Sequence, residues 1–144
     1  MPDLDDVRRF LTDEHGLAVV STVQSDGRVL SSVVNAGVTL NPATGAATVG
    51  FVSAGSSARL AHVRRGSPIT VTVRRGWRWV GVTGPATLIG PDDAIVGVDV
   101  PALLRDVFRS AGGTHDDWDE YDRVMAVERR TAVFIEPARI IGNP

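Results

Sequence analysis

The sequence predicts one mainly β domain with peripheral helices. Three successive segments rich in β-branched residues are joined by short glycine-containing turns, a pattern typical of an antiparallel meander. A later segment, 77–89, carries apolar residues at even positions, as the inner face of a barrel requires. The length of 144 residues also suits one domain, since domains run about 100–200 residues. We therefore expect residues 1–144 to form a single domain.

Local pattern and punctuation place the expected elements. Strands are expected over 17–23, 28–40, 47–53, 69–74, 77–89 and 131–136. Helices are expected over 3–14, 56–65, 101–111 and 116–129. The first helix has apolar residues at helical spacing and acidic residues in its first turn, where the helix dipole favours them.

Composition excludes several classes of function. The net charge is -2 with no long basic run, so the sequence lacks the clustered positive charge that nucleic-acid binding needs. The absence of cysteine excludes disulfide frameworks, thiolate catalysis and cysteine zinc sites. No apolar stretch approaches the roughly 20 residues of a membrane span. Because the first residues are acidic, unlike a signal peptide, we expect a cytoplasmic protein with no membrane or nucleic-acid partner.

The sequence shows no catalytic constellation. His15, His62 and His115 stand in unrelated contexts, and neither a Gly-x-Ser-x-Gly elbow nor a metal-ligand spacing occurs. Gly81 and Gly84 lie within an expected strand, so they do not form a nucleotide-binding fingerprint. Catalytic residues stay unassigned, and no metal site is expected. If the protein is an enzyme, a cofactor is expected to carry the chemistry.

The segment 51–59 is the best candidate for binding an anion. A helix that opens at Ser56 or Ser57 presents unpaired backbone N–H groups and the positive end of its dipole, which favours a phosphate. Arg59 would add a charge, and His62 lies three residues further on, where it could face the same ligand. The alternative is that the serine is an ordinary N-cap and Arg59 a solvated surface charge.

Two aromatic patterns also have alternative interpretations. Trp77 and Trp79 make the second face of segment 77–89 apolar at its start, so a helix, a second subunit or a flat ligand would cover it, unless the indoles are simply exposed. Trp118, Tyr121 and Met125 share one face of an expected helix. This spacing indicates core packing or, alternatively, the wall of a cleft or a dimer surface.

Several short motifs resemble a known family through their order and spacing. They are Ser25-Asp-Gly-Arg28, Ser57-Ala-Arg59 followed by Leu60-Ala-His-Val-Arg-Arg65, Trp77-Arg-Trp79 with Thr83-Gly84, and His115-Asp-Asp-Trp-Asp-Glu-Tyr121 with Met125, Arg129-Arg130 and Ile140-Ile-Gly142. Over nearly the whole chain they resemble the split β-barrel flavin and deazaflavin oxidoreductases related to pyridoxamine 5′-phosphate oxidase. The segment from His115 onward is similar to the actinobacterial subgroup that uses coenzyme F420.

The resemblance implies an antiparallel, FMN-binding-like split β-barrel of Greek-key type. It further implies a homodimer with a cofactor, F420 or alternatively FMN, at the subunit interface. The phosphate would lie on the segment after the third strand, and the ring along the second and third strands. The cofactor-binding residues implied by the resemblance are Ser32, Val33, Asn35, Phe51, Val52, Ser53, Ser57, Arg59, Trp77 and Trp79, and the spacing of the anion-binding segment adds Ser56 and His62.

The implied activity is hydride transfer from reduced F420 to a small organic substrate. An FMN-dependent oxidoreductase of the same fold, or a non-catalytic module for a flavin or another flat ligand, is the alternative. Ser57 departs from the family, which often has a second basic residue there. The chain ends with residues 139–144 instead of the Arg-Leu tail of the vitamin oxidases, which argues against pyridoxamine phosphate oxidation.

Overall fold

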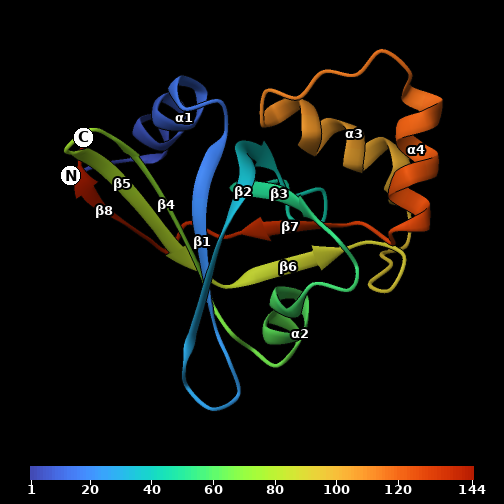
Figure 1. Ribbon diagram of the computed structural model, residues 1–144, viewed down its shortest axis with the longest axis horizontal. Coiled ribbons are helices and arrows are strands. Elements are labelled where there is room, and N and C mark those ends of the chain that lie inside the picture. Colours follow the sequence, from blue (N-terminus) through green and yellow to red (C-terminus); the bar gives the residue numbers. More distant parts are fainter.

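The computed structural model describes residues 1–144, and its strands form one curled antiparallel sheet (Figure 1). The strands are β1 (Leu17–Val23), β2 (Val29–Leu40), β3 (Ala47–Ser53), β4 (Ile69–Arg75), β5 (Arg78–Gly84), β6 (Ala86–Ile89), β7 (Thr131–Ile135) and β8 (Arg139–Asn143). The helices are α1 (Leu4–Asp13), α2 (Ala58–Arg64), α3 (Val100–Ser110) and α4 (Trp118–Val127). Across the sheet the strand order is β6-β7-β3-β2-β1-β4-β5-β8.

The curl of the sheet depends on β2 and on the crossing from β5 to β6. The first part of β2 pairs with β1, and the part from Ala36 onward pairs with β3. At Pro85 the chain passes from β5, near one edge, to β6 at the other, and the N–H of Glu136 donates to the Pro85 carbonyl at 2.9 Å. A Cβ on Gly84 would lie 1.7 Å from the Glu136 carbonyl oxygen, so this approach requires glycine. The predicted mainly β split barrel with peripheral helices is confirmed.

Two strand predictions were wrong. The single strand expected over 77–89 is two strands, because Pro85 has no N–H to donate to a ladder and stands where the chain changes partners. The pattern of that segment was informative all the same, since Val80 and Val82 are buried in the main core. The other error is β8, which was not expected and which pairs with β5.

The helices lie around the sheet and complete two apolar clusters. α1 contributes Val7, Phe10 and Leu11 to the main core inside the curl. α3 and α4 lie together on one side of the molecule and pack with β7 in a second cluster, which includes Val107 and Tyr121 (Figure 1). This second cluster fixes the position of α3 and α4 relative to β3 and β7. No helix here has the length and apolar character that crossing a bilayer requires.

Candidate anion and cofactor site

β2 and β3 separate at one point, and a cavity lies there. Their pairing runs from Leu40 opposite Ala47 to Ala36 opposite Phe51. Beyond that pair, β2 continues beside β1 and β3 continues beside β7. A cavity of about 340 Å³ lies between the diverging strands and the helices α3 and α4. It is lined by Val33, Val34, Asn35, Val52, Arg59, Val107, Phe108, Ala111, Tyr121, Met125 and Arg130.

Arg59 points from α2 to this divergence and is held there by hydroxyl groups. Its Nη1 donates to Ser53 Oγ at 3.0 Å, and its Nη2 donates to Ser32 Oγ at 2.6 Å. Ser53 Oγ also lies 2.8 Å from Ser57 Oγ. The guanidinium stands 5.8 Å from the centre of the Phe51 ring. A guanidinium has five N–H donors, so three remain for a ligand.

The charge of Arg59 has no carboxylate partner. None of the ion pairs in the structure includes this half-buried residue. Burial lowers the pKa of Arg59, and the neighbouring charge of Arg130 lowers it further. Because a guanidinium stays protonated in proteins, the lowered pKa means that its positive charge is unfavourable there. Arg130 is itself paired with Glu128, so Arg59 carries the charge without an acidic partner, and an anion bound to Arg59 would offset both the cost of its burial and the repulsion from Arg130.

The structure rejects the simpler explanation of the Ser57–Arg59 segment. Ser57 precedes α2 at the N-cap position, but its side chain makes no capping hydrogen bond and turns toward Ser53 instead. Arg59 is half-buried, so it is not a fully solvated charge. α2 has only seven residues, so the side chains of Arg59 and the serines, rather than a long helix dipole, define the site.

The structure brings together most of the residues expected from the sequence. Val33, Asn35, Val52 and Arg59 line the cavity. Ser32, Ser53, Ser57 and Phe51 contact Arg59 or one another beside it. The side-chain nitrogen of Asn35 donates to the His15 carbonyl, which holds β2 to the end of α1.

Four of the expected residues do not join this group within one chain. Ser56 is exposed, and His62 is only 6% exposed, with its Nδ1 2.8 Å from Thr22 Oγ1. His62 therefore faces β1, because one helical turn beyond Arg59 the short helix α2 already packs on the barrel. Trp77 is 95% exposed and lines, with Trp79, an open pocket on the β4–β5 hairpin.

Residues from the second half of the chain complete the cavity wall. Phe108 and Arg130 were not predicted to be part of the site, while Tyr121 and Met125 had both core packing and a cleft wall as interpretations. Tyr121 does both, since it belongs to the second apolar cluster and also lines the cavity. Its hydroxyl donates to the Leu104 carbonyl at 3.1 Å, and burial raises its pKa to about 12. The Arg129-Arg130 pair in the family motif was the one sequence signal for Arg130.

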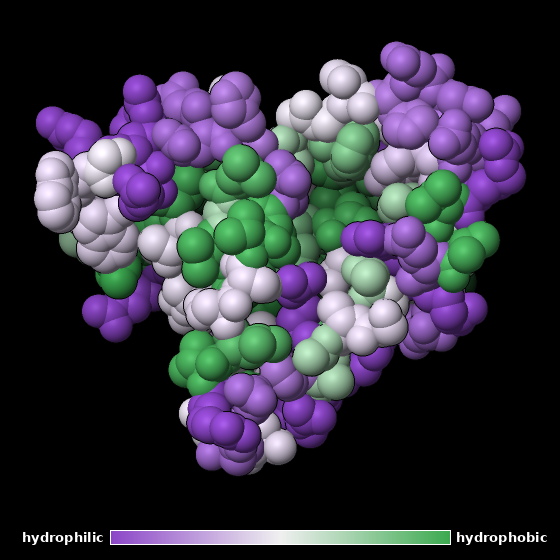
Figure 2. All heavy atoms as spheres, in the orientation of Figure 1, coloured by the Kyte–Doolittle hydropathy of each residue, from purple (hydrophilic) through white to green (hydrophobic).

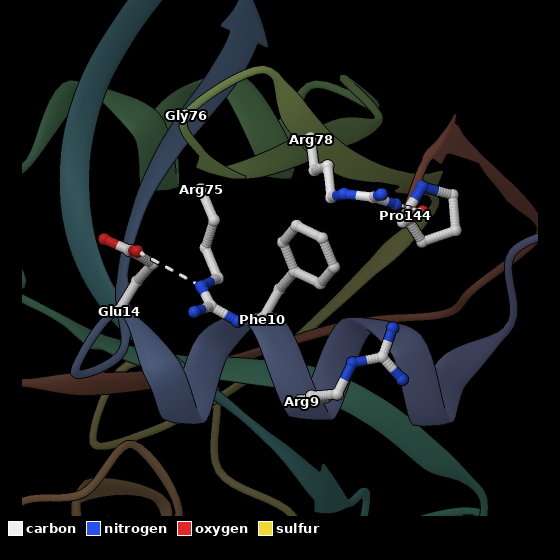
Figure 3. Close-up of a pocket in the computed structure, with 7 residues that line it drawn as sticks. All are labelled: Arg9, Phe10, Glu14, Arg75, Gly76, Arg78 and Pro144. Atoms are coloured by element: carbon white, nitrogen blue, oxygen red, sulfur yellow. Dashed lines mark hydrogen bonds and ion pairs between the residues drawn. The ribbon is translucent and has the colours of Figure 1, made fainter.

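A second, more open pocket of about 660 Å³ lies between α1 and the β4–β5 hairpin (Figure 3). Three arginines line it, and each has a partner. Arg75 pairs with Asp13 at 2.7 Å and with Glu14 at 4.0 Å, and Arg9 pairs with Asp6 at 2.9 Å. The third, Arg78, donates to the Pro144 carbonyl. This pocket offers no unbalanced charge comparable to that of Arg59.

The fold and the cleft define a split β-barrel protein with an anion-binding candidate where β2 leaves β3. No family model matches the sequence. Among solved structures the chain is similar to a conserved hypothetical protein from Mycobacterium tuberculosis, with a TM-score of 0.71 and 17% identity over 99% of this chain and 85% of that one. It is also similar to a pyridoxamine 5′-phosphate oxidase-related, FMN-binding protein from Nostoc punctiforme (TM-score 0.63, 13% identity, 96% and 81% covered) and to an F420 reductase (0.60, 11%, 88% and 90%). These likenesses establish the fold as that of the pyridoxamine 5′-phosphate oxidase-like split barrels.

Proposed function

We propose that the protein is an oxidoreductase that binds coenzyme F420 and transfers a hydride between it and a small organic molecule. The observation that carries the proposal is Arg59, a half-buried cation held by hydroxyl groups and lacking any acidic partner, at the edge of a cavity with apolar walls. The similarity in fold to an F420 reductase and the order of the sequence motifs support the choice of cofactor.

The residues of the site suit the two chemically different parts of such a cofactor. The three free N–H groups of Arg59 and the hydroxyl of Ser57 would hold the phosphate by charge-assisted hydrogen bonds. Val33, Val52 and Phe108 would contact the faces of the planar ring, because they line the same cavity. When bound, the deazaflavin ring supplies or accepts the hydride.

The contribution of the chain itself is to orient the reactants. Holding ring and substrate in contact replaces a bimolecular encounter with a positioned one. The apolar side chains of the wall exclude water from the ring. Tyr121 is not a candidate proton donor, because its hydroxyl hydrogen is already donated to the Leu104 carbonyl and burial raises its pKa to about 12.

A homodimer would complete this site. Leu17, Val19 and Val33 point outward from β1 and β2, with exposed fractions of 52%, 44% and 63%. Figure 2 shows apolar side chains gathered over the β1–β2 region of this face. Val33 belongs both to this face and to the cavity over Arg59, so a second copy packed on the face would close the open side of the cavity. Exposed apolar patches of this kind commonly mark an interface.

FMN is the second candidate cofactor. It also joins a phosphate to a tricyclic ring, and the similar Nostoc punctiforme protein is described as FMN-binding. Nothing in the hydroxyl and guanidinium groups around Arg59 selects one ring over the other.

Fluorescence titration of the purified protein with F420 and with FMN tests the proposal, together with light scattering for the mass in solution. We expect saturable binding of both cofactors by a dimer, with F420 bound more tightly, because the sequence motifs resemble the F420 subgroup. Tighter binding of FMN would transfer the proposal to that cofactor. Absence of binding to either, or a monomer with no ligand affinity, would reject it.

A further inference from the structure

A further cavity lies next to the proposed cofactor site and shares two lining residues with it. It has a volume of about 290 Å³, is partly open to solvent and is lined by residues of α3, α4 and the loop at Pro91. Val100, Leu104 and Met125 form its apolar surface together with Ala126, which is exposed to solvent. Met125 and Arg130 also line the proposed cofactor site and belong to the sequence motifs, whereas Val100, Leu104 and Ala126 line this cavity and not the cofactor site.

The charges at the rim of this second cavity are all paired. Arg105 Nε donates to Asp122 at 2.9 Å, and Arg130 lies 2.6 Å from Glu128. Arg129 Nε donates to Asp92 at 3.0 Å. These pairs hold the pKa of Asp92 and of Asp122 below the ordinary range, so the carboxylates stay ionised at neutral pH. The cavity therefore offers a ligand apolar contact without an unbalanced charge.

We propose that the cavity between α3 and α4 binds a small uncharged apolar molecule, of the size of one or two fused rings. Its volume is close to the lower limit of ordinary ligand pockets, about 300 Å³, which excludes larger ligands. A charged ligand would meet no unbalanced opposite charge at the rim and would have to leave water for an apolar surface, whereas an uncharged apolar ligand gains contact with Val100, Leu104 and Met125 without that cost.

The two cavities share part of their walls, so they are coupled. Met125 and Arg130 line both. Methionine has three rotatable bonds and changes rotamer readily, so a ligand on one side moves the surface presented to the other. By linkage, the effect of either ligand on the affinity of the other must be reciprocal.

Met125 provides a direct measurement. The chain has two methionines, and the other, Met1, is fully exposed. In protein labelled with ¹³C at the methionine methyl groups and free of cofactor, titration with indole should shift the Met125 signal saturably and leave that of Met1 unchanged. The absence of a saturable shift would overturn the proposal, whatever the protein does with F420 or FMN.

A matched pair of variants localises the binding. Ala126→Phe adds a large side chain at an exposed position of the cavity lining and should abolish the indole-dependent shift. Val127→Phe makes a similar addition at the next helix position, which is 84% exposed and outside the cavity, and should retain it. Equal responses of the two variants would place indole elsewhere and reject the site.

The coupling is tested separately with the cofactor that the titrations identify. Saturating indole should change the dissociation constant of that cofactor at least threefold in the wild type and leave it unchanged in Ala126→Phe. An unchanged dissociation constant in the wild type would reject the coupling. Whether the cavity binds indole would still be determined by the methyl shift.

Discussion

Two groups of arginine side chains in this protein differ in what balances their charge. In the pocket of Figure 3, Arg9 and Arg75 pair with acidic side chains of α1 or its end, and Arg78 donates to a carbonyl. At the divergence of β2 and β3, the guanidinium of Arg59 hydrogen-bonds only to the hydroxyls of Ser32 and Ser53. The larger and more open pocket is the one with balanced charges.

This difference separates arginines that hold the fold from an arginine available to a ligand. An exposed ion pair is already satisfied, so an anion gains little by displacing the carboxylate. Arg59 is partly removed from water and lies near a second positive charge, that of Arg130. A phosphate bound there would accept hydrogen bonds from Arg59 and would also reduce the repulsion between Arg59 and Arg130. Pocket size alone would select the region with balanced charges, whereas charge balance selects the cavity at Arg59.

Arg59→Ala should have the largest effect on binding. Removal of charge-assisted hydrogen bonds of about 1.5–3 kcal/mol should weaken F420 or FMN binding roughly 10- to 150-fold. Arg75→Ala removes a more exposed arginine from the paired group and should change the dissociation constant less than twofold. Fluorescence titration of the two variants beside the wild type measures both values. Similar losses in the two variants would mean that charge balance does not identify the ligand site.

Tyr121→Phe tests the wall that the cavity shares with the helical cluster. The substitution leaves the buried Leu104 carbonyl without the hydroxyl donor that lies at 3.1 Å, and the free energy of unfolding should fall by about 1–2 kcal/mol in urea denaturation. An unchanged midpoint and slope would show that this hydrogen bond does not hold α4 to α3.

The raised pKa of Tyr121 also predicts how the free energy of unfolding depends on pH. Burial raises the pKa of Tyr121 to about 12, from an ordinary value near 10, so the folded protein holds this proton more tightly than the unfolded chain does. The stabilisation is complete below about pH 10 and is lost as the pH rises toward 12. Tyr121 is the sole tyrosine, so phenolate absorbance reports it directly. The alkaline loss of stability should be smaller in Tyr121→Phe, and phenolate formation near pH 10 in the folded wild type would contradict the assignment.

Patterns of adjacent residues predicted the barrel and singled out the Arg59 segment. The features that they did not predict depend on pairing between residues far apart in the chain. The turns and the alternation of Val80 and Val82 are properties of adjacent residues, and they identified the sheet. The partner change at Pro85 depends on Glu136, which lies far along the chain. For the same reason, no spacing argument could place Phe108 in the wall of the cavity that Arg59 also lines.

The direction of a short helix also limited the prediction of site residues. His62 shares a helix face with Arg59 by spacing, but its side chain is buried against β1, where its Nδ1 lies 2.8 Å from Thr22 Oγ1. The exposed indole of Trp77 depends on whether a second chain covers the β4–β5 hairpin. Periodicity describes a face of an element and says nothing of which neighbour covers it.

Ser57→Ala distinguishes a ligand-binding hydroxyl from a helix cap. Because Ser57 makes no capping hydrogen bond, its loss should change the free energy of unfolding by less than about 0.5 kcal/mol while weakening cofactor binding several-fold. Asp117→Ala is the matched control, since Asp117 accepts hydrogen bonds from the N–H groups of Asp119 and Glu120 at the start of α4. It should lose about 1 kcal/mol of stability, the ordinary value of an N-cap. A loss of stability in Ser57→Ala equal to that control, without a change in binding, would restore the capping interpretation.

Arg75→Ala should have the smallest effect on the free energy of unfolding, and it tests the arginines whose charges are paired. Its ion pairs with Asp13 and Glu14 are exposed, so the free energy of unfolding should fall by no more than about 0.5 kcal/mol at low salt. Since salt screens exposed charges, this difference should disappear near 1 M salt, where the Debye length is about 3 Å. Urea denaturation of the variant and the wild type at both salt concentrations measures it. A loss that exceeds about 1 kcal/mol and persists in salt would mean that Arg75 stabilises the junction of α1 and the hairpin by packing as well as charge, and the contrast with Arg59 would then rest on binding alone.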